Sequence, residues 1–349
     1  MNKRPILGIT MGDPSGIGPE IAVKALGYSA IYTICRPLLI GDAHVMEKAV
    51  KEAAKRHDIT IRRVSSVSEC RFEYGVIDVY DLDNVEIDKL RIGAVDAMSG
   101  NAAFASIKKV IDLALAGEID ATITNPINKE ALNLAGHHYA GHTEIYADLT
   151  GTKNYSMMLA DGNFRVVHVS THVSLREACE RVKKDRVLEV IELAHHTCKS
   201  LGISEPRIAV AGLNPHAGEN GMFGWEEIEE ISPAIETAKA KGMQAEGPIP
   251  PDTVFAKARG GLYDIVVAMY HDQGHIPLKV TGFQYDRSTG KWQTINGVNI
   301  TLGLPIIRCS VDHGTAFDQA WRGLANESSL VNAIEYGVKL AANKGKTVS

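Results

Sequence analysis

The sequence predicts an α/β protein built as two lobes, and three observations support this. Short apolar runs of strand length, such as Ala121–Asn125 and Arg207–Ala211, alternate with longer segments whose apolar residues recur every three or four positions, as in helices. This strand–helix–strand rhythm occurs twice and is typical of parallel sheets covered by helices. The length, 349 residues, exceeds that of most single domains, so we expect two lobes.

The chain begins with a predicted strand, a glycine-rich loop and a helix. Ile6–Thr10 has the composition of a buried strand, and Ile21–Leu26 that of a helix, with Met11–Glu20 between them. Such a loop can hold an anion on its backbone N–H groups. Its spacing, G-x-x-x-G-x-G, matches neither the dinucleotide fingerprint nor a P-loop. A tight structural turn and a ligand-binding loop therefore stay equally open.

The middle of the chain predicts further helices and strands. Ser99 is expected to cap a helix whose apolar positions run from Phe104 to Leu115. The second rhythm consists of a strand, Phe164–Val169, a long helix, Leu175–Leu201, and the strand Arg207–Ala211. A helix from about residue 225 to 241 and a last one from about 330 to 342 complete the pattern.

The stretch Ala268–Lys279 is the leading candidate for a functional site. An apolar run, Ile265–Tyr270, ends there in ionisable groups. His271 and His275 have the i, i+4 spacing of a helical zinc motif, but the intervening glycine and the proline that follows argue against a regular helix. We therefore predict a loop at a strand end, where ligands gather in open α/β sheets.

Histidines at three predicted strand exits suggest a metal site. They are His172, His216 and His271. Parallel strands deliver their exits to one edge of a sheet, so the imidazoles can converge there and bind Zn²⁺ or Co²⁺ with a position open for substrate. The alternative for each is a structural histidine bonded to backbone.

Basic and polar groups elsewhere have the chemistry that a small phosphorylated acid requires. Lys279 and Arg308 supply positive charge, and His142, Thr143 and Asn299 supply fixed donors. Surface solvation is the alternative for the lysine, and an ion pair within the sheet is the alternative for the arginine.

Asp252, which follows two prolines, has two open interpretations. It can cap a helix that begins at Thr253. It can also receive a proton, or orient a ligating histidine, near a metal.

Composition and charge exclude or disfavour several classes of protein. The formal net charge of −5 offers no reason to expect a nucleic-acid partner. The 5 cysteines contain no C-x-x-C pair, which fits reduced thiols in a cytosolic enzyme. No signal peptide and no apolar run of roughly 18 residues is present, so a cytoplasmic location and no membrane contact are expected.

Five motifs together resemble the 4-hydroxythreonine-4-phosphate dehydrogenase family across nearly the full length. They are Gly12–Glu20, Gly141–Glu144, Gly212–Glu219, Tyr270–Gly274 and Gly297–Thr301. The resemblance implies that one divalent metal (Zn, Co, Mn or Mg) is bound by His172, His216 and His271 at a homodimer interface. It also implies that the substrate contacts are His142, Thr143, Lys279, Asn299 and Arg308.

A second resemblance concerns the cofactor. His313, Gly314, Thr315 and Ala316, with Asn326 further on, are similar to the adenosine-binding loop of the isocitrate and isopropylmalate dehydrogenases. This implies NAD, with NADP possible, and a two-lobed α/β/α fold of that type with the active site in the interlobe cleft. The expected lobes are residues 1–130 plus 310–349, and residues 131–309, the second carrying the metal site and the dimer interface.

Within the family, Asn125–Lys129, Glu219–Gly224 and His275–Lys279 look like the 4-phospho-D-threonate 3-dehydrogenase branch. The implied reaction is NAD-dependent, metal-assisted oxidation of 4-phospho-D-threonate, or its erythronate isomer, at C3, followed by decarboxylation to dihydroxyacetone phosphate. Asp252 and Lys279 are the expected catalytic residues. The polar segment Gln284–Thr294 departs from the family pattern, and its role is open.

Three alternatives remain at this stage. The first is the dehydrogenase of pyridoxal phosphate biosynthesis, whose substrate has an amine at C2. The second is a metal-dependent hydrolase, since three histidines and a carboxylate can also activate water. The third is a phospho-sugar-acid sensor without catalytic activity.

Overall fold

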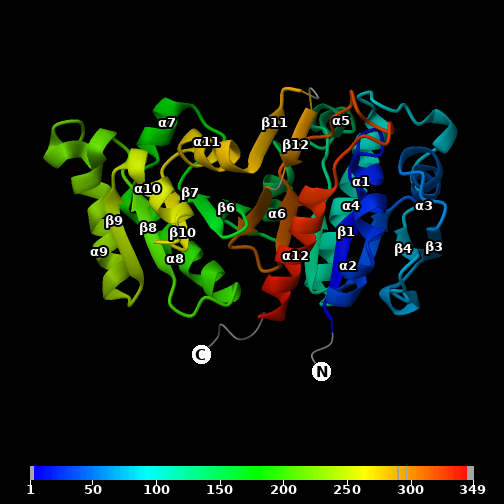
Figure 1. Ribbon diagram of the computed structural model, residues 1–349, viewed down its shortest axis with the longest axis horizontal. Coiled ribbons are helices and arrows are strands. Elements are labelled where there is room, and N and C mark those ends of the chain that lie inside the picture. The colour runs from blue at the N-terminus through cyan, green and yellow to red at the C-terminus, as the bar shows by residue number, and fades with distance from the viewer. Residues whose placement is uncertain (1–3, 289–290, 296, 344–349) are drawn as a thin grey trace. The chain divides into compact units, whose positions relative to one another are not determined.

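The computed structural model describes residues 4–288, 291–295 and 297–343, and its contacts divide the chain into two compact units (Figure 1). Unit 1 comprises the chain up to Lys153 together with Leu304–Ala342, and unit 2 comprises Asn154–Gly303 with Asn343. Both units alternate strands with helices, so the α/β prediction is confirmed.

The units differ from the expected lobes at both boundaries. Residues 131–153 and 304–309 belong to unit 1, not to the second lobe. The physical reason is packing: α5 (Lys129–Leu134) and α6 (His142–Leu149) contact α4 (Ala97–Leu115). The expected C-terminal end, 344–349, lies outside the described residues.

Unit 1 contains an all-parallel set of strands in the order β3-β4-β2-β1-β5-β14. The strands are β1 Ile6–Thr10, β2 Arg36–Gly41, β3 Thr60–Val64, β4 Val76–Asp81, β5 Ala121–Thr124 and β14 Arg308–Val311. The remaining helical elements of this unit are α1 Gly18–Leu26, α2 Ser29–Ile34, α3 Ala43–Lys48, η1 Ala49–Ala53, η2 Val67–Glu69, η3 Ile87–Lys89 and α12 Ser328–Ala342. The last helix, α12, packs against β5, β14 and α1, so the last helix of the chain lies beside the first (Figure 1).

The core of unit 1 forms where α4 covers the sheet. The predicted apolar positions Ile107, Val110 and Ile111 are buried and pack in one cluster with β2, whereas Leu115 at the helix end is half exposed. The helix is capped by Asp96, whose carboxylate accepts the N–H groups of Met98 and Ser99. The prediction that Ser99 is the cap was therefore wrong by three residues.

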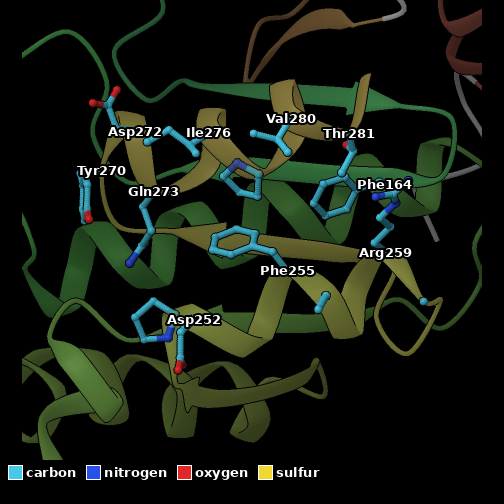
Figure 2. A pocket seen from close by; sticks show the side chains of 14 residues that line it. Phe164, Asp252, Phe255, Arg259, Tyr270, Asp272, Gln273, Ile276, Val280 and Thr281 are labelled. Carbon is cyan, nitrogen blue, oxygen red and sulfur yellow. The ribbon is translucent and has the colours of Figure 1, made fainter. Parts of the chain in front are cut away.

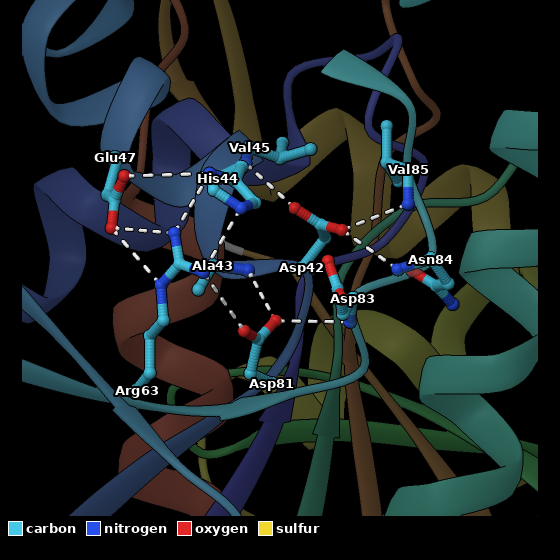
Figure 3. A network of polar contacts seen from close by, with 10 residues as sticks. All are labelled: Asp42, Ala43, His44, Val45, Glu47, Arg63, Asp81, Asp83, Asn84 and Val85. Atoms are coloured by element: carbon cyan, nitrogen blue, oxygen red, sulfur yellow. Dashed lines mark hydrogen bonds and ion pairs between the residues drawn. The ribbon is translucent and has the colours of Figure 1, made fainter.

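The acidic residues at the ends of β2 and β4 stabilise the neighbouring loops through hydrogen bonds to backbone N–H groups (Figure 3). Asp42 caps α3 through the N–H of Val45, and its other oxygen accepts the N–H groups of Asn84 and Val85. Asp81 accepts the N–H of Ala43 and so joins the two strand exits. These carboxylates are occupied by backbone donors, as expected for loops that need their N–H groups satisfied.

Unit 2 has a mixed arrangement in the order β13-β6-β7-β10-β8-β9. β7, β10, β8 and β9 run parallel, while β6 is antiparallel to both β13 and β7. The strands are β6 Ser156–Asp161, β7 Phe164–His168, β8 Arg207–Ala211, β9 Gln244–Ile249, β10 Ile265–Ala268 and β13 Val298–Leu302. The helical elements are α7 Leu175–Glu180, α8 Lys184–Ser200, η4 Pro215–Gly221, η5 Glu227–Ile231, α9 Ser232–Ala240, α10 Pro251–Arg259 and α11 His271–Gly282.

Two predicted helices of unit 2 differ from the observed ones. The long helix expected over Leu175–Leu201 is two helices, because the chain leaves helical geometry at Lys183, whose backbone is extended. The helix expected from residue 225 begins at Glu227 with a π-helical turn and continues as α9.

The polar segment that departs from the family pattern forms a hairpin. β11 Phe283–Asp286 and β12 Lys291–Ile295 pair antiparallel, and residues 289–290 lie outside the described part of the chain. Among the helices described, none combines the length and apolar character needed to cross a membrane.

Candidate functional site

A buried arginine in unit 1 is the centre of a polar group that we call the Arg308 cluster: Arg308, Thr124, His142, Thr143 and Tyr146. Arg308 is the first residue of β14 and is only 3% exposed. Its Nη2 donates to Thr124 Oγ1 at 3.1 Å and its Nη1 to Thr143 Oγ1 at 3.4 Å, and its Cζ lies 5.4 Å from the Tyr146 ring centroid. Burial lowers the pKa of Arg308. A guanidinium group forms strong charge-assisted hydrogen bonds with carboxylates and phosphates, so the cluster suits an anion.

His142 adds a further donor or acceptor to the cluster. It is the first residue of α6, and burial, followed by the charge of Arg308, holds its pKa well below the ordinary value, so the ring is neutral at physiological pH. Its Nε2 is buried and has no hydrogen-bond partner in the part of the chain that the structure describes. A buried ring nitrogen in this state needs a partner, and a ligand can supply one.

The structure therefore brings His142, Thr143 and Arg308 together in unit 1 and places the other two predicted substrate residues in unit 2. Lys279 lies in the last turn of α11 and is half-buried. Asn299 lies in β13, where its Nδ2 donates to Met157 Sδ at 2.8 Å. The amide oxygen of Asn299 is buried without a partner among the described residues.

The three predicted metal ligands follow three neighbouring strands of unit 2. β10 pairs in parallel with β7 on one side and with β8 on the other, so the exits that carry His172, His271 and His216 lie at one edge. The rings of His172 and His271 have centroids 5.7 Å apart. A pocket of about 640 Å³ is lined by both, together with Tyr270, Asp272 and Glu177.

His216 is not brought to the other two histidines. Its ring lies 6.2 Å from that of Phe223, centroid to centroid. The five residues from His216 to Asn220 all have positive φ, between 42° and 81°, which is rare for residues other than glycine. In residues 4–288, 291–295 and 297–343, no group of three or more His, Cys, Asp or Glu side chains could hold a metal. One chain thus brings together two of the three proposed ligands.

Glu227 holds the chain leading to His216 in place. This carboxylate is 2% exposed, and its Oε1 accepts the N–H groups of Leu213 and Asn214 at 2.8 and 2.7 Å. Its Oε2 accepts from Asn214 Nδ2. Glu227 is not recognisable as a structural residue from the sequence, because the glutamate-rich segment around it resembles an ordinary solvated helix surface.

The prediction of a loop after Tyr270 was wrong, because His271–Gly282 forms the helix α11. Gly274 does not break the helix but lets it approach β7, since a Cβ at this position would lie 2.3 Å from Nε2 of His168. Gln273 anchors the first turn: its Oε1 accepts the Met269 N–H and its Nε2 donates to the Gly212 carbonyl. Pro277 is accommodated inside the helix.

Because α11 is a helix, His275 stacks on His271. The ring centroids are 3.6 Å apart and the planes differ by 10°, and His275 Nδ1–H donates to the His271 carbonyl at 2.9 Å. The ring centroid of His168 lies 4.8 Å from that of His275. Burial lowers the pKa of His275 to about 3 and that of His168 to about 4, so both rings are neutral at physiological pH.

The Nδ1 of His271 donates to Asp272 Oδ1 at 2.7 Å. This bond selects the tautomer that leaves Nε2 with a lone pair, which is the usual state of a metal-ligating histidine. The i, i+4 spacing of His271 and His275 was a correct sign of the helix, although we interpreted the sequence against it.

Asp252 lies in the first turn of α10, where Pro250 and not Asp252 occupies the cap position. It lines a second pocket, of about 970 Å³, together with Phe255, Tyr270 and Asp272 (Figure 2). Tyr270 and Asp272 line both pockets, so Asp252 and the pair His172–His271 lie in adjoining cavities.

The predicted cofactor residues lie in unit 1, after β14 and before α12. His313 to Ala316 follow the strand after one residue, Asp312, and Thr315 is buried there with its carbonyl accepting the N–H of Ile17 at 3.0 Å. Asn326 precedes α12, and its Oδ1 accepts the Ser328 N–H. The contact between the Thr315 loop and the N-terminal glycine loop was not foreseen.

Comparison with known proteins places these features in a family. Residues 33–337 match the sequence profile of the family described as pyridoxal phosphate biosynthetic protein PdxA. A D-threonate 4-phosphate dehydrogenase from Cupriavidus necator is 47% identical over 341 residues, which cover 97% of this chain and 98% of the relative. One of the same name from Salmonella typhimurium is 48% identical over 335 residues, covering 96% of this chain and 98% of the relative.

A solved structure has the same fold throughout. The crystal structure of a 4-hydroxythreonine-4-phosphate dehydrogenase from Klebsiella pneumoniae has a TM-score of 0.84 and 44% identity, over 97% of this chain and 99% of that chain. The relatives thus have names that refer to two different substrates.

Proposed function

The chain belongs to the PdxA family, and on that basis we propose that it is an NAD-dependent dehydrogenase of 4-phospho-D-threonate, or of its erythronate isomer, assisted by a divalent metal. The proposed reaction oxidises the C3 hydroxyl to a ketone. The resulting β-keto acid then loses CO₂ and yields dihydroxyacetone phosphate. The names of the relatives from Cupriavidus necator and Salmonella typhimurium support this substrate.

The Arg308 cluster is the single observation that carries the proposal. A substrate with a phosphate and a carboxylate needs a fixed positive charge in a protected place, and Arg308 is a buried cation surrounded by hydroxyls. We assign to Arg308 and Thr143 the binding of an anionic group, and to His142 Nε2 a hydrogen bond to the same ligand. Lys279 and Asn299 are the further substrate contacts in this proposal.

Two of the three proposed metal ligands lie close together in one chain. His172 and His271 lie close enough to share an ion, and the Asp272 bond leaves Nε2 of His271 available. His216 lies elsewhere, so we propose that a second copy of the chain completes the set of three. When bound, the metal would lower the pKa of the C3 hydroxyl and polarise the new carbonyl, and the nicotinamide would accept the hydride.

Asp252 and Lys279 are the proposed proton-transfer groups. Oxidation releases the proton of the C3 hydroxyl, and decarboxylation leaves a carbanion that must be protonated. A carboxylate can take up the first proton, and an ammonium group can deliver the second. The position of Asp252 on the wall of the pocket that adjoins the histidines supports this assignment.

Exposed apolar groups on α11 support a homodimer. Ile276 and Val280 are 59% and 74% exposed on the pocket that also contains Phe255 (Figure 2). A contiguous apolar surface of this kind is typical of a protein contact. It is formed by the same helix that carries His271, as expected if the second copy reaches the metal site.

The test is an absorbance assay of nicotinamide reduction with 4-phospho-D-threonate, with and without a chelator. We expect turnover that stops when the metal is removed. A higher kcat/KM with 4-hydroxythreonine 4-phosphate, the substrate in the name of the Klebsiella relative, would contradict the substrate assignment. Phosphate release without nicotinamide reduction would favour a hydrolase, and ligand binding without turnover would favour a sensor.

Mixing inactive variants tests the shared metal site. His216→Ala and His271→Ala are each expected to be inactive, but a mixture allowed to exchange subunits should recover about a quarter of the sites, because half of the heterodimer sites then have all three ligands. Each variant incubated alone is the control. Failure to recover activity, although heterodimers form, would show that the ligands come from one chain.

A further inference from the structure

The N-terminal glycine loop is packed against the segment proposed to bind the cofactor. The N–H of Ile17 donates to the Thr315 carbonyl at 3.0 Å. Gly16 lies so close that a Cβ would be 3.0 Å from both the Cβ and the carbonyl oxygen of Thr315. The indole N–H of Trp321 donates to the Pro14 carbonyl. Of the two interpretations left open by the sequence, these contacts favour a structural one.

Glu20, in the first turn of α1, is bonded to the part of the segment that precedes α12. Its carboxylate is fully buried, with Oε1 accepting the Ala325 N–H at 2.9 Å and Oε2 the Gly323 N–H at 3.1 Å. Lys24, one turn later on α1, donates to Glu20 Oε1 at 2.7 Å. The same ammonium group donates to the carbonyls of Gly323 and Ala325 at 3.0 and 2.7 Å.

Four of these five bonds join the pair to a short stretch without regular secondary structure. Residues 324–327 belong to no helix or strand, and Asn326 follows directly on Ala325. A buried ion pair contributes little net stability, because desolvation offsets the Coulomb attraction. Such a pair does fix the geometry of the groups that it bonds, and here both N–H and C=O groups of Gly323 and Ala325 are bound.

We propose that Glu20 and Lys24 are positioning residues for the nicotinamide cofactor, acting through Asn326. They touch neither substrate nor cofactor, and they keep the segment before α12 in the conformation that binds the adenosine part. The inference rests on the proposed function, since it takes His313–Ala316 and Asn326 as the cofactor loop. It assigns a role to the first glycine motif, which the proposed reaction does not otherwise use.

The first experiment compares Glu20→Gln and Lys24→Met with the wild-type full-length enzyme, by calorimetric NAD binding and by steady-state kinetics. We expect the Kd and KM for NAD to rise about tenfold, since bonds to charged groups are lost, while kcat and the KM for the phosphorylated acid stay within about twofold. Lys24→Arg, which keeps the charge, should restore most of the affinity.

Lys108→Met is the matched control. Lys108 forms the same type of i, i+4 ion pair with Asp112 on α4, at 2.8 Å, but it is exposed and lies outside the cofactor segment. Its NAD affinity should equal that of the wild type. Melting curves select a temperature at which every variant is folded. Unchanged NAD affinity in folded Glu20→Gln and Lys24→Met would overturn the inference.

A double-mutant cycle with Asn326→Ala separates positioning from general stability. If Glu20 acts through Asn326, Glu20→Gln should weaken NAD binding in the wild type but not in the Asn326→Ala background. Independent, additive effects would overturn the inference while leaving the dehydrogenase assignment intact. Failure of the wild type to bind either NAD or NADP would instead overturn the proposed function itself.

Discussion

The Arg308 cluster of unit 1 and the three histidines of unit 2 represent two ways of building a site. Arg308 is buried within one unit, and two hydroxyls and a ring, all from that unit, define its position. The histidines lie at the exits of three adjacent strands, but only His172 and His271 come together. His216 lies in a turn whose residues have positive φ.

The two proposed sites differ in whether a single chain can form them. A buried cation is positioned by folding alone, so the proposed anion-binding group is expected in every folded chain. The proposed metal site, by contrast, requires a contribution from a second copy of the chain. Substrate affinity should therefore depend on single residues, and metal affinity on the assembly and on side chains that orient the ligands.

The largest effect is expected at Arg308. Arg308→Met should lower kcat/KM by about a thousandfold, because the guanidinium group that binds the substrate anion is lost. The kcat/KM of Arg308→Lys should lie between those of the wild type and Arg308→Met. Melting curves of the ligand-free protein verify that the variant is folded at the assay temperature. Arg165→Lys, at a buried arginine of unit 2 bonded to the Asp264 carbonyl, is the control and should retain activity. Wild-type activity of Arg308→Met would show that Arg308 does not bind the substrate anion.

A second buried charge of unit 1 predicts a pH dependence of stability. Burial raises the pKa of Asp13 to about 6, although Ser15 N–H donates to its Oδ1. A raised pKa means that the contribution to stability is fully present below about pH 4 and is lost as the pH rises through 6. Asp13→Asn should therefore be more stable than the wild type at pH 8, by about 2 to 3 kcal/mol.

Urea denaturation at several pH values measures this difference. The gap between Asp13→Asn and the wild type should shrink to roughly half at pH 5, because the wild-type carboxyl is then largely protonated in the folded state. A gap that stays constant from pH 8 to pH 5 would show that Asp13 does not titrate in this range.

A smaller effect on stability is expected in unit 2, at the contact that supports α11. Gly274→Ala should lower the free energy of unfolding by about 2 kcal/mol, because the new methyl group would overlap the buried His168 ring. Gly260→Ala, at the end of α10, is the matched control, since a Cβ there meets its nearest atom at 3.4 Å. Equal stability of the two variants would mean that α11 does not depend on this contact.

The smallest effect is expected on metal affinity, at His275. His275→Ala should weaken metal binding about tenfold, because the ring that stacks on His271 is lost, whereas His275→Phe should retain most of the affinity. Metal titration monitored by calorimetry measures both. If alanine and phenylalanine weaken binding equally, the stack does not orient His271.

The sequence by itself determined the features that depend on local periodicity. The alternation of strands and helices, the buried face of α4 and the positions of the strand exits all followed from the spacing of apolar residues. These properties repeat every two or every three to four residues, so a short window of sequence contains them.

Only the tertiary structure decided the features that depend on contacts between distant residues. Gly274 was mistaken for a helix breaker because its partner, His168, is far away in the sequence. The backbone before His216 is bonded to Glu227, which lies later in the sequence, and Glu20 is bonded to Gly323 and Ala325, about 300 residues away. A close approach or a buried hydrogen bond between such residues leaves no periodic signal, so the identities of the residues alone could not reveal it.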